Sequence, residues 1–136
     1  MKSIKFIFTL FLVASLASCN GQQKKASDEG AVVEVVKTEV FEKAASDVQL
    51  VDVRTPGEYS EGYIKNAINI DIFGDDFMGK MSKLDKNKPV YVYCKSGHRS
   101  GNAAEKLEEA GFTKVYDLDG GFLQWKGDGK HVSGKK

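Results

Sequence analysis

The stretch VYVYCKSGHRSGNAAEKLEEAG, residues 90–111, decides the fold and the chemistry that we expect of this chain. It begins with VYVYC, a β-branched and aromatic run typical of a strand buried on both faces of a parallel sheet. Residues 100–110 then show helical spacing, and Gly111 stands where a left-handed helix cap favours glycine. Cys94 therefore ends a predicted central strand, directly before the loop that leads into a helix.

Short apolar runs alternate with helical stretches along the rest of the domain. This order predicts βαβ units, and hence an α/β fold with a central, mainly parallel five-stranded sheet and helices on both faces. Ligands bind beyond the carboxyl ends of strands in such sheets, which is where Cys94 lies. The predicted strands are 32–36, 48–53, 67–70, 90–94 and 113–118; the predicted helices are 41–45, 73–84 and 100–110, with a short helix or turn at 57–64 and 120–126.

Length and charge narrow the possible functions. The chain has 136 residues, enough for one domain, and a formal net charge of +1. A nucleic-acid partner is not expected, because there is no broad basic field. We predict a monomer.

The N-terminus has the pattern of an export signal. Lysines precede the apolar run IKFIFTLFLVASLAS, which is too short to span a membrane and suits a signal-peptide core. The following Leu16-Ala17-Ser18-Cys19 resembles a bacterial lipobox, in which the cysteine is acylated. We predict a lipoprotein signal peptide at 1–18, lipidation of Cys19, a flexible tether at 19–31 and a domain at 32–134.

These features predict an exported protein that is lipid-anchored to a bacterial membrane and faces the periplasm. The alternative is an ordinary secreted protein in which Cys19 is incidental. If Cys19 carries lipid, Cys94 is the other cysteine of the chain and has no partner for an internal disulfide. A lone thiol in an oxidising compartment is either buried and inert or present for its chemistry.

The loop CKSGHR has the composition of an anion cradle. Gly97 permits a tight bend, and the helix that follows presents unpaired backbone N–H groups. We expect these amides, together with Lys95, Arg99 and protonated His98, to favour the thiolate of Cys94. No second cysteine stands nearby as in a CxxC motif, and no metal-ligand spacing is present, so no metal or organic cofactor is implied. Phosphate ester hydrolysis and sulfur transfer both use such a cradle.

Three ordered blocks, 50–70, 93–100 and 120–125, resemble the rhodanese-like domain family; the resemblance covers residues 41–127. It implies a rhodanese fold in which Cys94 takes sulfane sulfur from a small donor (thiosulfate, polysulfide or persulfide). Cys94 would hold that sulfur as a persulfide and pass it to a thiol or cyanide. The loop that would bind substrate and persulfide consists of Lys95, Ser96, Gly97, His98 and Arg99.

Loop length separates the chemistries within this superfamily. Only four residues lie between Cys94 and Arg99, one fewer than in the phosphatase relatives. The smaller ring of amides suits a single terminal sulfur better than a tetrahedral phosphate, so we favour a sulfurtransferase. A phosphatase of the related cysteine-loop type and a non-catalytic tethered binding module are the alternatives. The module is disfavoured because Cys94 is present.

Roles for the surrounding polar residues follow from their positions. Arg99 would either bind the substrate anion or fix the loop through a salt bridge, and both interpretations stay open. Lys95 would attract substrate, whereas His98 would either tune the field or have no role. Asp52 and Arg54 end a predicted buried strand, where we expect them to support the site by pairing with each other or with loop backbone.

The chain also departs from the family pattern. Tyr63 and Lys65 stand where many members have histidine and proline. Glu58 stands where thiosulfate-using members can carry arginine, which weakens the case for thiosulfate as donor. Phe122 and Trp125 are expected in the core, because a glycine pair before an aromatic motif indicates close packing.

Overall fold

The computed structural model describes residues 32–44 and 48–134. The predicted signal peptide, Cys19 and the tether lie outside these residues, and their assignment stays a prediction.

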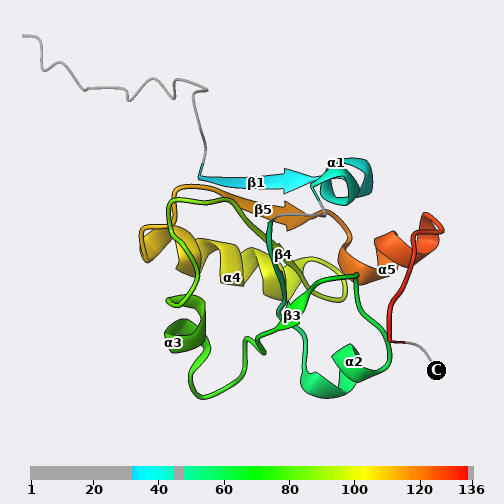
Figure 1. The fold of residues 1–136 in the computed structure, drawn as a ribbon, viewed down its shortest axis with the longest axis horizontal. Coiled ribbons are helices and arrows are strands. Elements are labelled where there is room, and N and C mark those ends of the chain that lie inside the picture. The colour runs from blue at the N-terminus through cyan, green and yellow to red at the C-terminus, as the bar shows by residue number, and fades with distance from the viewer. Residues whose placement is uncertain (1–31, 45–47, 135–136) are drawn as a thin grey trace, which may run out of the picture.

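A sheet of five parallel strands forms the centre of the domain (Figure 1). Its spatial order is β1-β5-β4-β2-β3, which puts the predicted central strand in the middle and confirms the parallel five-stranded sheet. The middle strand is buried along its whole length. The strands are β1 (Val33–Val36), β2 (Gln49–Asp52), β3 (Ile68–Asn69), β4 (Val90–Tyr93) and β5 (Val115–Leu118).

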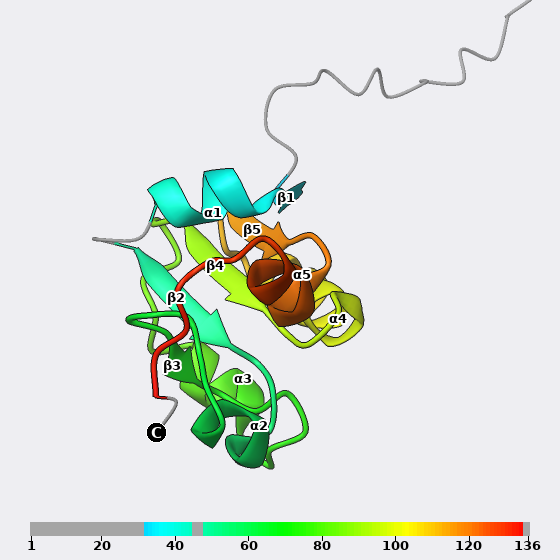
Figure 2. The same cartoon turned by 90° about the vertical axis from the view of Figure 1, so that its right-hand side faces the viewer.

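Helices cover both faces of the sheet, as predicted (Figures 1 and 2). The described part of the chain contains no helix that is long and apolar enough to cross a membrane. On one face lie α3 (Phe77–Met81) and α4 (His98–Glu109); on the other lie α1 (Thr38–Lys43) and α5 (Gly121–Gly127), while α2 (Pro56–Ser60) follows the carboxyl end of β2.

The alternation of side chains along β4 divides the core into two layers. Val90, Val92 and Cys94 point toward α3 and α4, whereas Tyr91 and Tyr93 pack with residues of α1 and α5. All five side chains are at most 9 % exposed, so burial of apolar surface on both faces holds the strand in place. Phe122 and Trp125 belong to the second layer, as expected from the sequence.

The predicted helix at 73–84 is wrong over most of its length, because only α3 is helical there. Gly74 donates its N–H to the carbonyl of Asp71, which forms a turn, and the Phe73 side chain is 71 % exposed. The helical spacing counted Phe73 as a core residue. Two other boundaries moved toward the N-terminus: α1 begins at Thr38 and α4 begins at His98.

The glycine pair before α5 brings this helix against the Cys94 loop. Gly121 has a φ of +59°, and a Cβ atom there would lie 2.6 Å from the carbonyl oxygen of Cys94. The close approach lets Phe122 donate its N–H to that oxygen at 2.8 Å, and Leu123 donate to the carbonyl of Lys95 at 3.0 Å. The amino end of α5 therefore fixes the backbone on which the thiol sits.

We predict that Gly121→Ala lowers the free energy of unfolding by about 2–4 kcal/mol, since alanine adds left-handed strain and overlaps fixed backbone atoms. Urea denaturation measures the change. Gly127→Ala is the matched control, because it lies in the same helix and its added methyl group would meet no atom within 4 Å beyond the neighbouring residues and helix backbone. Equal destabilisation by both substitutions would contradict the account of the glycine pair.

Candidate active site

Cys94 directly follows β4 and is 1 % exposed. The loop behind it turns at Gly97, whose φ is +106°, and α4 begins at the next residue. This turn brings the Gly97 N–H to 3.1 Å from the Cys94 Sγ atom, and the Ser100 hydroxyl lies 3.5 Å from the same sulfur. The loop and the first turn of the helix thus place hydrogen-bond donors around the sulfur.

Hydrogen bonding decides the ionisation of this thiol. Burial alone raises the pKa of Cys94, because an apolar environment disfavours the thiolate. Bonds from the Ser100 hydroxyl and from the backbone amides of Ser100, Gly97 and Ser96 outweigh burial, so the pKa lies below its ordinary value. The site therefore favours the nucleophilic form of sulfur.

The source of this stabilisation differs in part from our expectation. We expected Lys95 and His98 to help by charge, but both side chains are exposed, and the largest lowering effects come from the Ser100 hydroxyl and nearby amides. Sequence reasoning missed Ser100. Its signal was a small polar residue directly after the loop, in the first turn of the helix, on the side of α4 that faces the strand. Its side chain is fully buried.

Arg99 is held by a carboxylate. Its two terminal nitrogens bond Glu58 at 2.7 and 2.8 Å in a bidentate pair. The Arg99 guanidinium, with help from Thr55, lowers the pKa of Glu58 to about 2. Thr55 caps α2 with Glu58 in a capping box, so this pair ties α2 to α4. Of the two interpretations left open by the sequence, the structure contains the salt bridge.

Asp52 and Arg54 form a second ion pair beneath the site, and both are nearly fully buried. The Arg54 Nη2 atom lies 2.6 Å from an Asp52 oxygen and also donates to the carbonyl of Gly62 at 2.7 Å. The guanidinium lies 4.1 Å from the centre of the Phe122 ring. Multiple partners satisfy both charges, as a buried pair requires.

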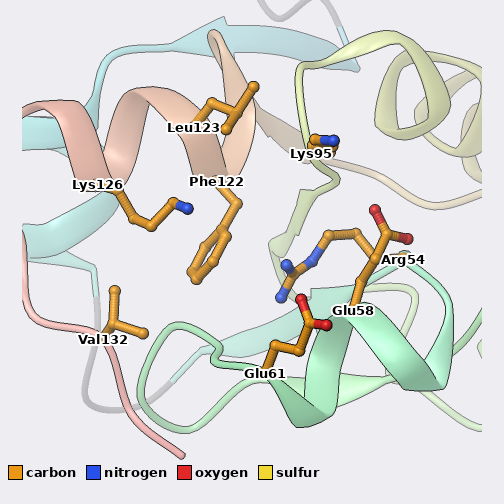
Figure 3. Close-up of a pocket in the computed structure, with 8 residues that line it drawn as sticks. All are labelled: Arg54, Glu58, Glu61, Lys95, Phe122, Leu123, Lys126 and Val132. Carbon is orange, nitrogen blue, oxygen red and sulfur yellow. The ribbon is translucent and has the colours of Figure 1, made fainter. Parts of the chain in front are cut away.

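A cavity of about 520 Å³ opens beside the loop (Figure 3). Ammonium groups of Lys95 and Lys126 and the carboxylates of Glu58 and Glu61 lie around it, so its lining is mixed in charge. Among residues 32–44 and 48–134, no three His, Cys, Asp or Glu side chains gather as metal ligands. The remaining lining residues are Arg54, Phe122, Leu123 and Val132.

A family model described as "Rhodanese-like domain" matches residues 37–128. The chain belongs to the rhodanese-like domain family. Thiosulfate sulfurtransferase GlpE of Coxiella burnetii is 42% identical over 84 residues, covering 59% of this chain and 73% of the relative. The uncharacterized protein YqhL of Bacillus subtilis is 34% identical over 124 residues, covering 91% of each chain.

Solved structures agree with this membership. A rhodanese-related protein from Thermoplasma volcanium has a TM-score of 0.67 and 29% identity, covering 75% of this chain and 99% of that one. A rhodanese-like domain protein from Staphylococcus aureus has a TM-score of 0.61 and 32% identity, covering 68% of this chain and 90% of that one. The fold predicted from the sequence is thereby confirmed as a rhodanese-like domain.

We predict that Ser100→Ala raises the pKa of Cys94 in this rhodanese-like domain, because the thiolate loses a hydrogen bond. A bond to a charged group contributes about 1.5–3 kcal/mol, so alkylation by iodoacetamide at pH 7 should slow about tenfold. Ser96→Ala is the control, because Ser96 acts through its backbone amide and its side chain is exposed. Equal alkylation rates for the two variants would show that the hydroxyl does not stabilise the thiolate.

Proposed function

We propose that this chain is a sulfurtransferase in which the Cys94 thiolate carries sulfane sulfur as a persulfide. The observation that supports this most strongly is the set of donors around the Cys94 sulfur, since they lower the pKa of a thiol that burial alone would keep protonated. A binding module has no use for such an arrangement. The family's sulfurtransferase-named members support the same conclusion.

The chemistry proceeds in two transfers. The thiolate attacks the outer sulfur of a donor, a new S–S bond forms at Cys94, and the donor leaves with the electron pair of its own broken bond, as sulfite from thiosulfate or as a thiolate from a persulfide. An acceptor thiolate or cyanide then attacks the terminal sulfur and releases Cys94 as thiolate. The hydrogen-bond donors around the Cys94 sulfur stabilise a negative charge there, and hence both the thiolate and the persulfide.

Arg99 favours sulfur transfer over phosphate hydrolysis. Its guanidinium is occupied by the bidentate bond to Glu58. A phosphatase loop needs its arginine for the oxygens of the phosphate. The small ring between Cys94 and Arg99 supports the same choice.

The cavity indicates how donors are selected. Lys95 and Lys126 would attract an anionic group, whereas Glu61 would repel a dianion in the same space; the charge of Glu58 is already balanced by Arg99. This combination favours a persulfide or polysulfide of low charge over thiosulfate. We place this activity at a bacterial membrane surface, facing the periplasm, through lipid on Cys19.

Intact mass measurement tests the persulfide. In the full chain with Cys19→Ser, which leaves one thiol, a sulfane-sulfur donor should add about 32 Da, the mass of one sulfur atom. Cyanide should remove it as thiocyanate. Cys94→Ser in the same background should gain no mass, and persulfide donors should load Cys94 faster than thiosulfate.

The alternatives predict other outcomes. No mass gain with thiosulfate, polysulfide and persulfide donors alike would overturn the sulfurtransferase proposal and favour the binding module. Release of phosphate from an aryl phosphate, lost in Cys94→Ser, would instead favour the phosphatase.

The membrane assignment has its own test. Expressed in a bacterial host, the chain should fractionate with membranes, and its mature form should lack residues 1–18 and carry acyl chains on Cys19. Cys19→Ser should leave the chain unacylated and outside the membrane-anchored fraction. Finding the unsubstituted chain processed and soluble, without acyl groups, would contradict lipidation.

A further inference from the structure

Arg99 binds a carboxylate of its own chain with the group that would otherwise bind an anionic substrate. Its terminal nitrogens Nη1 and Nη2 donate to the two oxygens of Glu58 at 2.7 and 2.8 Å. Two parallel bonds of this kind are also how a guanidinium recognises the oxygens of phosphate or another tetrahedral anion. While Glu58 is bound, this fork of Arg99 is not available to a substrate.

Thr55 holds Glu58 from a second side. Its backbone N–H and its hydroxyl lie 3.1 and 3.0 Å from the Glu58 Oε2 atom, so the carboxylate takes part in four hydrogen bonds. The Arg99 and Glu58 side chains are 19 % and 28 % exposed, which shields the pair in part from water and strengthens it. The Arg99 bond lowers the pKa of Glu58 to about 2, so the carboxylate keeps its charge wherever a thiolate can act. Glu58 is therefore a fixed part of the site.

Glu58 faces the cavity beside the Cys94 loop. Among the described residues, Glu58 and Lys95 line this cavity and Arg99 does not. The Glu58 side chain extends from α2 toward the part of the cavity where Lys95 lies (Figure 3). Arg99 is in the first turn of α4, and four residues separate it from Cys94 along the chain. A substrate that enters the cavity therefore meets Glu58 before it meets Arg99.

We propose that Glu58 determines which sulfur donors this site accepts, because it occupies the end of Arg99 that would bind the charged group of a dianionic donor such as thiosulfate. The inference rests on the proposed function and assigns its donor selectivity to one residue. An organic persulfide carries no oxyanion group, so it reacts at Cys94 without needing Arg99.

The chemistry of thiosulfate shows what Arg99 would contribute if it were free. The Cys94 thiolate bonds the outer sulfur, the S–S bond of thiosulfate breaks, and sulfite leaves with the electron pair of that bond. A free guanidinium would bind the sulfite oxygens in a fork before and after the bond breaks. Lys95 and Lys126 remain in the cavity, but an ammonium group attracts as a point charge and does not offer this geometry. Without the fork, thiosulfate binds weakly.

Sulfate tests the occupied fork without any sulfur transfer, because it matches the shape and charge of thiosulfate but has no sulfane sulfur. The chain contains two arginines, Arg54 and Arg99, so nitrogen-15 labelling of arginine gives few side-chain signals to follow in the full chain with Cys19→Ser. In Glu58→Ala, sulfate should shift the Arg99 signal until it saturates. In the parent chain the Arg99 signal should not shift, and the signal of Arg54, which Asp52 binds, should stay in place in both.

Loading rates test the selectivity itself. Intact mass followed over time gives the rates at which thiosulfate and a persulfide donor add sulfur to Cys94. Glu58→Ala should raise the thiosulfate rate by about tenfold or more, the factor that one hydrogen bond to a charged group contributes, and should change the persulfide rate much less. Glu58→Gln removes the charge but suits the capping box of α2, so it should give a smaller gain in the same direction. Arg99→Lys added to Glu58→Ala should abolish the gain.

Glu61→Ala is the matched control, since Glu61 lines the same cavity but does not bond Arg99. It removes the same charge and leaves the fork occupied, so its gain with thiosulfate should be clearly smaller than that of Glu58→Ala. Equal gains in both variants would show that charge repulsion alone selects the sulfur donor and would overturn the proposal. A sulfate shift in Glu58→Ala supports the proposal whether or not Cys94 carries sulfur, and the lack of that shift overturns it even if Cys94 loads.

Discussion

The contact that constrains the site most strongly joins the Cys94 sulfur to the Gly97 backbone N–H, 3.1 Å away. It exists only if the end of β4 and the start of α4 keep a fixed separation, because a hydrogen bond weakens steeply with small changes in geometry. The fold meets this requirement by burying β4 on both faces and by packing α4 directly on that strand and on β5. A rigid frame then presents a thiol to preformed donors, at no reorganisation cost during reaction.

Three sets of contacts hold the Cys94 loop in this geometry from different sides. The amino end of α5 bonds the carbonyls of Cys94 and Lys95 from one side, and the Glu58 carboxylate fixes Arg99 from another. Beneath them, the buried pair of Asp52 and Arg54 holds the end of β2 against Phe122. Such a buried pair adds little net stability against an apolar substitute, but losing one partner leaves an uncompensated charge. The pair therefore acts mainly by fixing the position of the site.

The sequence predicted the sheet well because the relevant signals are local. A fully apolar run such as 90–94 belongs in the middle of a parallel sheet, and the alternation of runs and helical stretches determines the layers. The helix predicted at 73–84 was wrong over most of its length, because a loop and a helix can share the same apolar spacing. The side-chain contacts at the site could not be predicted from the sequence, for a different reason. Glu58 meets Arg99 across 41 residues, and the Arg54 guanidinium lies over the ring of Phe122, which is far along the chain. Neither follows from spacing along the chain.

Sulfur transfer through Cys94 is the central claim, and isotope tracing in one turnover tests it most directly. A persulfide donor whose outer sulfur is a heavy isotope is added to the full chain with Cys19→Ser, and the peptide containing Cys94 is analysed before and after cyanide. The account predicts one labelled sulfur per chain on Cys94, which then leaves entirely as labelled thiocyanate. Labelled thiocyanate formed without label ever residing on Cys94 would contradict it.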